Sequence, residues 1–224
     1  EQFRPAPRPA GLYAALSAWM GWVARNFDAG RQRHAWVVWS LAVLAPSALL
    51  ALAYLVVFEV SVLLALALDV TVLVFTLGFR QFSHHFTAIR DALDRGDERQ
   101  ARELLSQWQG LDASDMRRED LLRHVIEQSL LAAHRHVFGV FFWFVVLSAL
   151  GLGPTGALLY RLAAFASREW AGAEGLAHES LRDVAARMFL RIDHIPARLT
   201  AAGFAVVGNF EEAVNGWRRD AHCW

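Results

Sequence analysis

Two long runs of apolar residues lie in the first half of the chain. Residues 35–58, AWVVWSLAVLAPSALLALAYLVVF, contain no charge, and a helix needs about 20 such residues to cross a bilayer. Residues 60–79 form a second run that only Asp69 interrupts. Because the link between the runs is very short, the pattern predicts a transmembrane helical hairpin over residues 35–79, with a kink at Pro46.

A charged segment with helical spacing follows, and it predicts a water-facing helical module over residues 80–136. Its first helix should end near Gly96, where Asp97 can cap a second helix that runs through Trp108. After a loop, a third helix is expected to begin near Asp115. The apolar stripe of the first helix consists of Phe82, Phe86, Ile89 and Leu93.

The third helix has no stop signal before a third apolar run at residues 137–160. Three glycines and Pro154 interrupt this run, so it predicts either one broken span or a re-entrant helix pair. Amphipathic helices are expected over residues 161–224. Residues 199–208 are apolar but too short to span, so they should lie at the membrane surface or against the other helices. With an amphipathic N-terminal segment at residues 1–34, the pattern predicts an all-α, polytopic membrane protein with the helical module between its spans.

Composition agrees with a membrane location. The chain is 55% hydrophobic, with a mean hydropathy of +0.27, which exceeds the usual soluble composition. Its 22 basic residues, all arginine, balance 22 acidic ones, so no nucleic-acid partner is expected. The single cysteine, Cys223, excludes an internal disulfide and a cysteine-based metal site. The hairpin places more arginines with the N-terminus and the central module, which indicates that both lie on the cytoplasmic side of a multi-pass protein.

Ionisable groups within or beside the apolar runs are the candidate chemistry. Asp69 should face protein or water, either as a proton- or ligand-binding group, as in a transporter, or as an interhelical contact. His124, Glu127 and His134 share a helical stripe that could hold a metal or pass a proton. Their spacing is not the HExxH arrangement, and no metal site is predicted.

A second charged group surrounds Pro196. Asp193, His194 and Arg198 flank this proline, which is expected to break the helix either as an anion-binding break or as a hinge.

Read in order, these pieces resemble the CobD/CbiB superfamily of bacterial membrane proteins, which includes the AmpE proteins. The most specific blocks are GALLYRLA, residues 156–163, and IPARLTA, residues 195–201. The resemblance covers roughly residues 78–208 and implies that further chain lies beyond both ends. The other matching positions are Arg80, His85, Leu93, Gly96, Asp97, Ala101, Arg102, Gly110, Asp112 and Glu127, with the aromatic run FFWF after them.

The best-known activity of this superfamily is ATP-dependent amide formation between cobyric acid and an aminopropanol derivative, which implies ATP and Mg²⁺. The chain departs from the synthase pattern where those enzymes carry carboxylates, asparagines or an arginine. The replaced positions are Leu111, Leu131, Ala132, Arg135, Ala164, Phe189 and Leu190. The sequence IDHIP is similar to the LDWVP-like segment of AmpE proteins.

The resemblance therefore implies an AmpE-like regulatory or ligand-sensing protein of the inner membrane without the synthase reaction or a predicted cofactor. The alternative is a divergent cobinamide-phosphate synthase-like ligase that uses ATP with Asp112, Glu127 and Asp193. The expected partners are the lipid bilayer and a small anionic or corrinoid ligand. The residues expected to line its pocket are Arg80, His85, Asp112, Glu127, Arg161, Arg187, Asp193 and Arg198, each of which could instead form an interhelical salt bridge.

Overall fold

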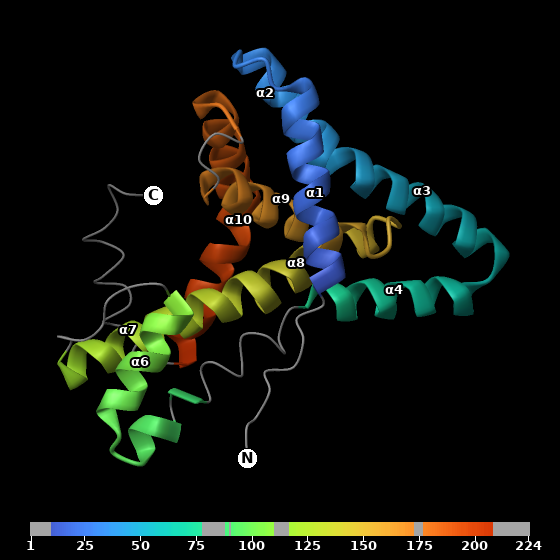
Figure 1. Cartoon of the computed structure of the whole chain (residues 1–224). Coiled ribbons are helices and arrows are strands. Elements are labelled where there is room, and N and C mark those ends of the chain that lie inside the picture. The colour runs from blue at the N-terminus through green and yellow to red at the C-terminus, as the bar shows by residue number, and fades with distance from the viewer. Residues whose placement is uncertain (1–9, 78–87, 90, 110–116, 173–176, 208–224) are drawn as a thin grey trace. The chain divides into compact units, whose positions relative to one another are not determined.

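The computed structural model describes residues 10–77, 88–89, 91–109, 117–172 and 177–207, which form helices and turns without a strand (Figure 1). This confirms the predicted all-α class for the described residues. The helices are α1 (Ala10–Phe27), α2 (Gln32–Trp39), α3 (Ala45–Val60), α4 (Val62–Thr76), α6 (Glu98–Gln109), α7 (Arg118–Ala133), α8 (Gly139–Ala149), α9 (Thr155–Gly172) and α10 (Glu179–Val207). Two π-helical turns, η1 (Ser40–Leu44) and η2 (His134–Phe138), connect α2 to α3 and α7 to α8.

The chain divides into two compact units. Unit 1 comprises Glu1–Val70 and Trp143–His194, and unit 2 comprises Thr71–Phe142 and Ile195–Trp224. The five segments predicted from sequence are a different kind of division and stay a prediction.

Two continuous helices are long and apolar enough to cross a membrane. They run over Gln32–Val60, 29 residues, and Arg118–Ala149, 32 residues, and only 17% of the most apolar window of each is buried. A core helix of a soluble protein would bury most of that window, so these two helices are candidate membrane spans. The first helix contains the predicted span. Helix α4 has 15 described residues, short of the roughly 20 that a span needs, and the predicted run continues into residues outside those described.

The first of these helices accommodates Pro46 by a π-helical turn. Proline has no backbone N–H, so the carbonyl of Ala42 loses the donor that position 46 would normally supply. The indole Nε1 of Trp19, on α1, donates to this carbonyl at 3.4 Å, and the Ser47 hydroxyl donates to the Val43 carbonyl at 2.7 Å. A neighbouring helix thus satisfies the acceptor that the proline frees, as expected for a proline in a membrane helix.

The predicted break at Pro196 is wrong. Helix α10 continues through Pro196 from Glu179 to Val207. The carbonyl that this proline frees belongs to Ile192, and the indole Nε1 of Trp143 donates to it at 3.0 Å. Because a tryptophan replaces the lost donor, the helix does not have to end there.

The structure shows how the third apolar run is interrupted. Helix α8 ends in a Schellman motif, in which Gly151 has φ +79° and the N–H of Leu152 donates to the carbonyl of Leu147. After a short turn, α9 begins at Thr155, so two helices occupy residues 139–172. Whether they form one broken span or a re-entrant helix pair stays a prediction. At Gly156, an added Cβ would collide with the backbone carbonyl of Trp143, so this glycine permits the close approach of the two helices.

The helical module of unit 2 follows its sequence signals closely. Gly96 ends the first helix with φ +78°, and the Asp97 carboxylate accepts the backbone N–H of Gln100 at 3.0 Å. The second helix then runs to Gln109, one residue past the predicted end. The third helix begins at Arg118. Asp115, Phe82, Phe86 and the loop between the second and third helices lie outside the described residues.

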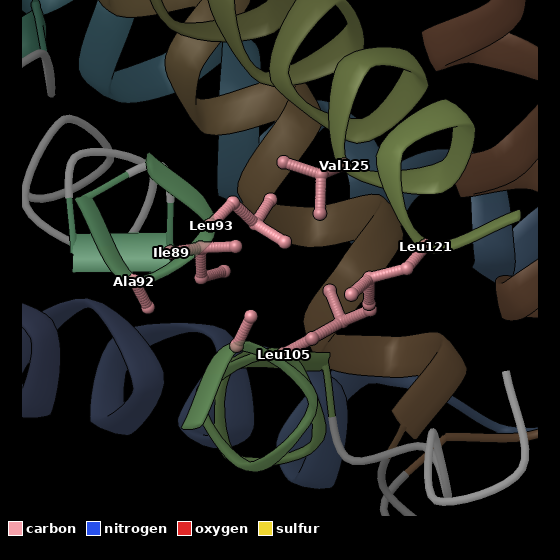
Figure 2. Packing of buried hydrophobic residues seen from close by; sticks show 7 residues of the cluster. Ile89, Ala92, Leu93, Leu105, Leu121 and Val125 are labelled. Atoms are coloured by element: carbon pink, nitrogen blue, oxygen red, sulfur yellow. The ribbon is translucent and has the colours of Figure 1, made fainter. Parts of the chain in front are cut away.

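A small apolar core holds these helices together. Ile89 and Leu93 lie against side chains from α6 and α7, among them Leu105 and Leu121 (Figure 2). The remaining members of this core are Ala92, Ala101 and Val125. The predicted apolar stripe is therefore confirmed at Ile89 and Leu93, the two positions that the structure describes.

Candidate functional site

A buried tyrosine and a carboxylate connect α9 to α10 in unit 1. The hydroxyl of Tyr160 donates to Oδ1 of Asp193 at 2.7 Å, and its ring lies 5.7 Å from that of Phe189. Hydrogen bonds to a charged acceptor are shorter and stronger than neutral ones. Asp193 is therefore held at a defined position. We call this group, with Trp143 and Ile192, the α9–α10 seam.

Local sequence spacing places the seam residues on facing sides of the two helices. Phe189 and Asp193 are four residues apart on α10 and so share one face. On α9, the buried residues Ala157, Ala163 and Ala164 surround Tyr160 and leave room for a close neighbour. Small residues around a single large ring thus fix where the tyrosine hydroxyl can reach.

Trp143 fixes the backbone next to Asp193. Its indole N–H binds the carbonyl of Ile192, the residue before Asp193, at 3.0 Å. Since Pro196 cannot supply this bond, Trp143 controls the course of α10 at the carboxylate. Neither Tyr160 nor Trp143 was predicted as a site residue. The tyrosine lies in the GALLYRLA block and the tryptophan in FFWF, but sequence spacing alone could not pair them with residues 33 and 49 positions away.

Arg187 lies at a different place in unit 1 from Asp193. The two residues are six apart and point to different faces of α10. The Arg187 side chain is exposed, and its Nε donates to the backbone carbonyl of Asp183 at 3.2 Å. It lines an open hollow of about 490 Å³ together with Gly30, Gln32, His178, Glu179, Ser180 and Asp183.

Two residues of this hollow, Gly30 and His178, also belong to a long-range junction between the end of α1 and the start of α10. The carboxylate of Asp28 accepts the backbone N–H groups of Gly30 and His178, each at 3.1 Å, and also contacts the His178 ring at 3.1 Å. Its side chain is 2% exposed. Burial on its own would raise the pKa of Asp28, but the hydrogen bonds from His178 and Gly30 outweigh it and lower that pKa.

Gly30 is required at this junction. Its φ of +71° is a conformation that side chains other than glycine rarely adopt, and an added Cβ would lie 3.2 Å from the His178 ring. The sequence placed His178 beside a glycine- and alanine-rich linker and gave no sign of a partner 150 residues earlier.

In unit 2, Glu127 and Arg198 are both exposed. Glu127 accepts a hydrogen bond from Nε of Arg123, one turn earlier on the same helix, at 3.0 Å. A polar contact between helices here joins His134 and Thr200, whose Nδ1 and Oγ1 atoms are 2.9 Å apart. This pair connects the start of η2 to the IPARLTA block.

The apolar end of α10 packs beside this pair. The ring of Phe204 meets that of Phe138 edge-on at 6.1 Å. This contact fits the predicted place against the other helices for the part of residues 199–208 that the structure describes, and the membrane surface stays the alternative prediction.

The predicted stripe of His124, Glu127 and His134 does not form a compact cluster. His134 is only 7% exposed and lies against Thr200, whereas Glu127 faces outward with Arg123. Within the described residues, no three His, Cys, Asp or Glu side chains lie close enough together to hold a metal ion.

Asp69 contacts the neighbouring helix of the apolar hairpin. The hydroxyl of Tyr54 on α3 hydrogen-bonds to its carboxylate, while Oδ1 is buried without a partner in the described part of the chain. This interhelical contact is one of the two interpretations predicted for Asp69, and a ligand-binding role stays a prediction.

The predicted pocket residues are thus divided over the chain. Arg161, Arg187 and Asp193 belong to unit 1, and Glu127 and Arg198 belong to unit 2. Arg161 is partly buried on α9, next to Tyr160. The other predicted pocket residues, Arg80, His85 and Asp112, lie outside the described residues. A common pocket therefore stays a prediction.

Comparison with known proteins gives a consistent picture. The model of a family described as "CobD/Cbib protein" matches residues 3–224. A cobalamin biosynthesis protein CobD from Chromobacterium violaceum is 33% identical over 162 residues, which cover 72% of this chain and 50% of that protein. A protein of the same name from Stutzerimonas stutzeri is 31% identical over 203 residues, which cover 89% of this chain and 63% of that protein.

The alignments cover 50% of the first relative and 63% of the second, so the chain spans less than two thirds of the length of either protein. No solved structure matches the chain.

Proposed function

The chain belongs to the CobD/CbiB family, and from this premise we propose that it acts in cobalamin biosynthesis as a membrane-bound, cobinamide-phosphate synthase-like ligase. The observation that carries the proposal is the family match over nearly the whole chain, together with two relatives named for cobalamin biosynthesis. The reaction joins the carboxyl group of cobyric acid to the amine of an aminopropanol derivative. Amide formation releases the elements of water, which ATP takes up when it is hydrolysed.

The α9–α10 seam is the part of unit 1 that we assign to substrate binding. Tyr160 and Trp143 position Asp193 from the side chain and the backbone, respectively. A carboxylate held in this way can orient the ammonium group of the amine substrate. Arg161, the residue after Tyr160, carries the guanidinium that we assign to an anionic group of the substrate.

The described residues do not fit a bound Mg²⁺–ATP of the synthase type. Magnesium bound with ATP is held by one or two carboxylates together with phosphates, and Leu131, Phe189 and Leu190 are apolar where the synthase pattern has carboxylates. Where the resemblance implies synthase carboxylates, Phe189 packs on Tyr160 and Leu190 is 67% exposed. We therefore assign no step to the metal, and Asp112 lies outside the described residues.

A membrane location is supported by the family and by the two apolar helices. We propose a multi-pass protein of the bacterial inner membrane, with the helical module on the cytoplasmic side where ATP is available. The exposed apolar side chains of α3 and α4 fit this proposal, since water would otherwise cover them.

A second candidate function is an AmpE-like regulatory or ligand-sensing role. The specific observation in its favour is the loss of synthase side chains at Leu131, Ala132, Phe189 and Leu190. Under this proposal the seam binds a ligand without transforming it. The two functions share a site and differ in whether a product forms.

One experiment separates them. The full chain, purified in detergent, is incubated with cobyric acid, ATP and the aminopropanol substrate, and the corrinoid product is measured by mass spectrometry. The ligase proposal expects an amide product that Asp193→Asn abolishes, whereas Asp183→Asn, an exposed carboxylate on the same helix, leaves it unchanged.

Calorimetry with cobyric acid completes this test. Saturable binding that requires Asp193, without product, favours the regulatory role. If a folded protein shows neither binding nor product, the cobalamin proposal is contradicted.

A further inference from the structure

An aromatic surface is exposed at one end of unit 1. It consists of Trp19, Trp22 and Phe27 on α1 and Trp36 on α2, whose exposed fractions are 38%, 48%, 42% and 38%. The rings of Trp19 and Trp22 stack at 5.7 Å, and Phe27 meets Trp22 edge-on at 5.9 Å. We call these four side chains the aromatic rim. Such a concentration of large exposed rings indicates a partner surface.

Three arginines lie at the same end of the α1–α2 hairpin. Arg25 is in the last turn of α1, and Arg31 and Arg33 flank the first residue of α2. All three are exposed, and within the described part of the chain none of them forms an ion pair. The guanidinium of Arg25 folds back along α1 over Gly21.

Three exposed arginines of the helical module behave differently. Arg99, Arg117 and Arg123 are each ion-paired with a carboxylate on their own helix, at 3.0 to 3.2 Å. At the α1–α2 end, the carboxylate of Asp28 is buried and bound to His178. The exposed carboxylates of Glu179 and Asp183 line the nearby hollow together with Arg187, and Arg25, Arg31 and Arg33 are not among its lining residues. The surface is therefore positively charged and available to an anion.

The rim lies at the start of the first candidate span. Arg31 and Arg33 flank Gln32, the first residue of the 29-residue apolar helix, and Trp36 follows one turn later. The indole of Trp19 donates to the carbonyl of Ala42, ten residues after Gln32, so α1 runs beside the N-terminal part of that helix. Arginines beside tryptophan rings at the end of an apolar helix are typical of the bilayer interface. There the rings lie at headgroup depth and the cations contact lipid phosphates.

We propose that the aromatic rim, together with Arg25, Arg31 and Arg33, binds the headgroup layer of an anionic phospholipid bilayer. The arginines contact lipid phosphates, and the rings lie in the zone between headgroups and acyl chains. The surface selects anionic over zwitterionic lipid and sets the depth of α1 and α2 in the membrane. This inference goes beyond the proposed enzymatic function and does not depend on it.

The test measures lipid selection by the full chain. The protein in detergent is incubated with equal amounts of phosphatidylglycerol and phosphatidylcholine, and the bound lipids are quantified by native mass spectrometry. The wild type is expected to enrich phosphatidylglycerol, and the triple variant Arg25→Gln, Arg31→Gln, Arg33→Gln to lose that enrichment roughly tenfold or more.

A matched control carries the same change in net charge. The variant Arg99→Gln, Arg117→Gln, Arg123→Gln should keep the enrichment, because these arginines lie in the helical module. Equal loss in both triple variants, or none in the first, overturns the proposal.

Two further measurements address misfolding of the triple variant and self-association of the chain. The single variants Arg25→Gln, Arg31→Gln and Arg33→Gln should each lose part of the enrichment, which keeps the test valid if the triple variant does not fold. Light scattering of Trp22→Ala is expected to show the wild-type mass. A change of oligomeric state without a change in lipid preference would instead assign the rim to a second copy of the chain and overturn the proposal.

Discussion

The α9–α10 seam and the helical module of α6 and α7 use charged side chains in opposite ways. In the seam, Tyr160 and Asp193 are 33 residues apart, and the tyrosine is fully buried. In the module, ion pairs such as Arg99–Glu103 join residues one turn apart, with side chains 90% and 60% exposed. The seam contact joins two helices, whereas the module contact lies on the surface of a single helix.

The physical reason for this difference is solvent. A hydrogen bond to a charged group away from water stabilises a fold by about 1.5 to 3 kcal/mol, whereas an exposed ion pair contributes about 0.2 to 1 kcal/mol. The module is instead held by its small apolar core (Figure 2). Substitution of polar groups should therefore affect stability strongly in the seam and weakly in the module.

Removal of the tyrosine hydroxyl should have the largest effect. Tyr160→Phe keeps the buried ring but deletes the donor to Asp193, so we expect it to lower the free energy of unfolding by about 2 kcal/mol. The measurement is denaturant unfolding in detergent, followed by circular dichroism. A loss smaller than that caused by Glu127→Gln in the module would contradict the contrast between the two regions.

The indole donor of Trp143 should come next. Trp143→Phe leaves the Ile192 carbonyl without its donor beside Pro196, and we expect a loss of about 1 to 2 kcal/mol by the same measurement. Trp170→Phe is the matched control. The Trp170 indole is buried, but its Nε1 has no partner in the described part of the chain. If both variants lose the same stability, ring packing rather than the hydrogen bond is responsible.

The junction at Asp28 should show an intermediate effect that depends on pH. Because the pKa of Asp28 is lowered from 3.8 in the folded state, its charge stabilises the fold above about pH 4. This stabilisation is lost as pH falls through the lower folded pKa. We expect Asp28→Asn to cost about 1 kcal/mol at neutral pH and progressively less below about pH 4, as measured by unfolding at a series of pH values. If the difference in unfolding free energy between the wild type and Asp28→Asn grows on acidification, the pKa of Asp28 is not lowered by folding.

The smallest effect is expected in unit 2. Glu127→Gln removes only an exposed pair with Arg123, so the free energy of unfolding should change by less than about 0.5 kcal/mol. A loss as large as that of Tyr160→Phe would show that Glu127 has a partner beyond its own helix. The same variant tests the predicted role of Glu127, since corrinoid binding should be lost if it lines the pocket.

Local signals in the sequence were reliable where one residue acts on its neighbours. Gly96 and Asp97 predicted a helix end and a helix start, and both are confirmed by backbone geometry and a capping hydrogen bond. The apolar run at residues 35–58 predicted the long helix that contains it. The helix break predicted at Pro196 is wrong because Trp143, which is distant in sequence, replaces the hydrogen-bond donor that the proline lacks.

The family was also predicted from short blocks of sequence, and the comparisons confirm it. The AmpE-like subtype rested on substituted carboxylates. The two named relatives favour the cobalamin pathway instead, and the subtype stays a proposal.

The sequence by itself determined the helical class, the main apolar helix and the family, because periodicity, capping and short motifs act over a few residues. Only the tertiary structure decided that α10 continues through Pro196, that Asp193 pairs with Tyr160 and that Asp28 anchors the start of α10. These contacts join residues from 33 to 150 positions apart. Each depends on which helix packs beside which, and helix packing places a donor next to an acceptor that no local pattern can identify.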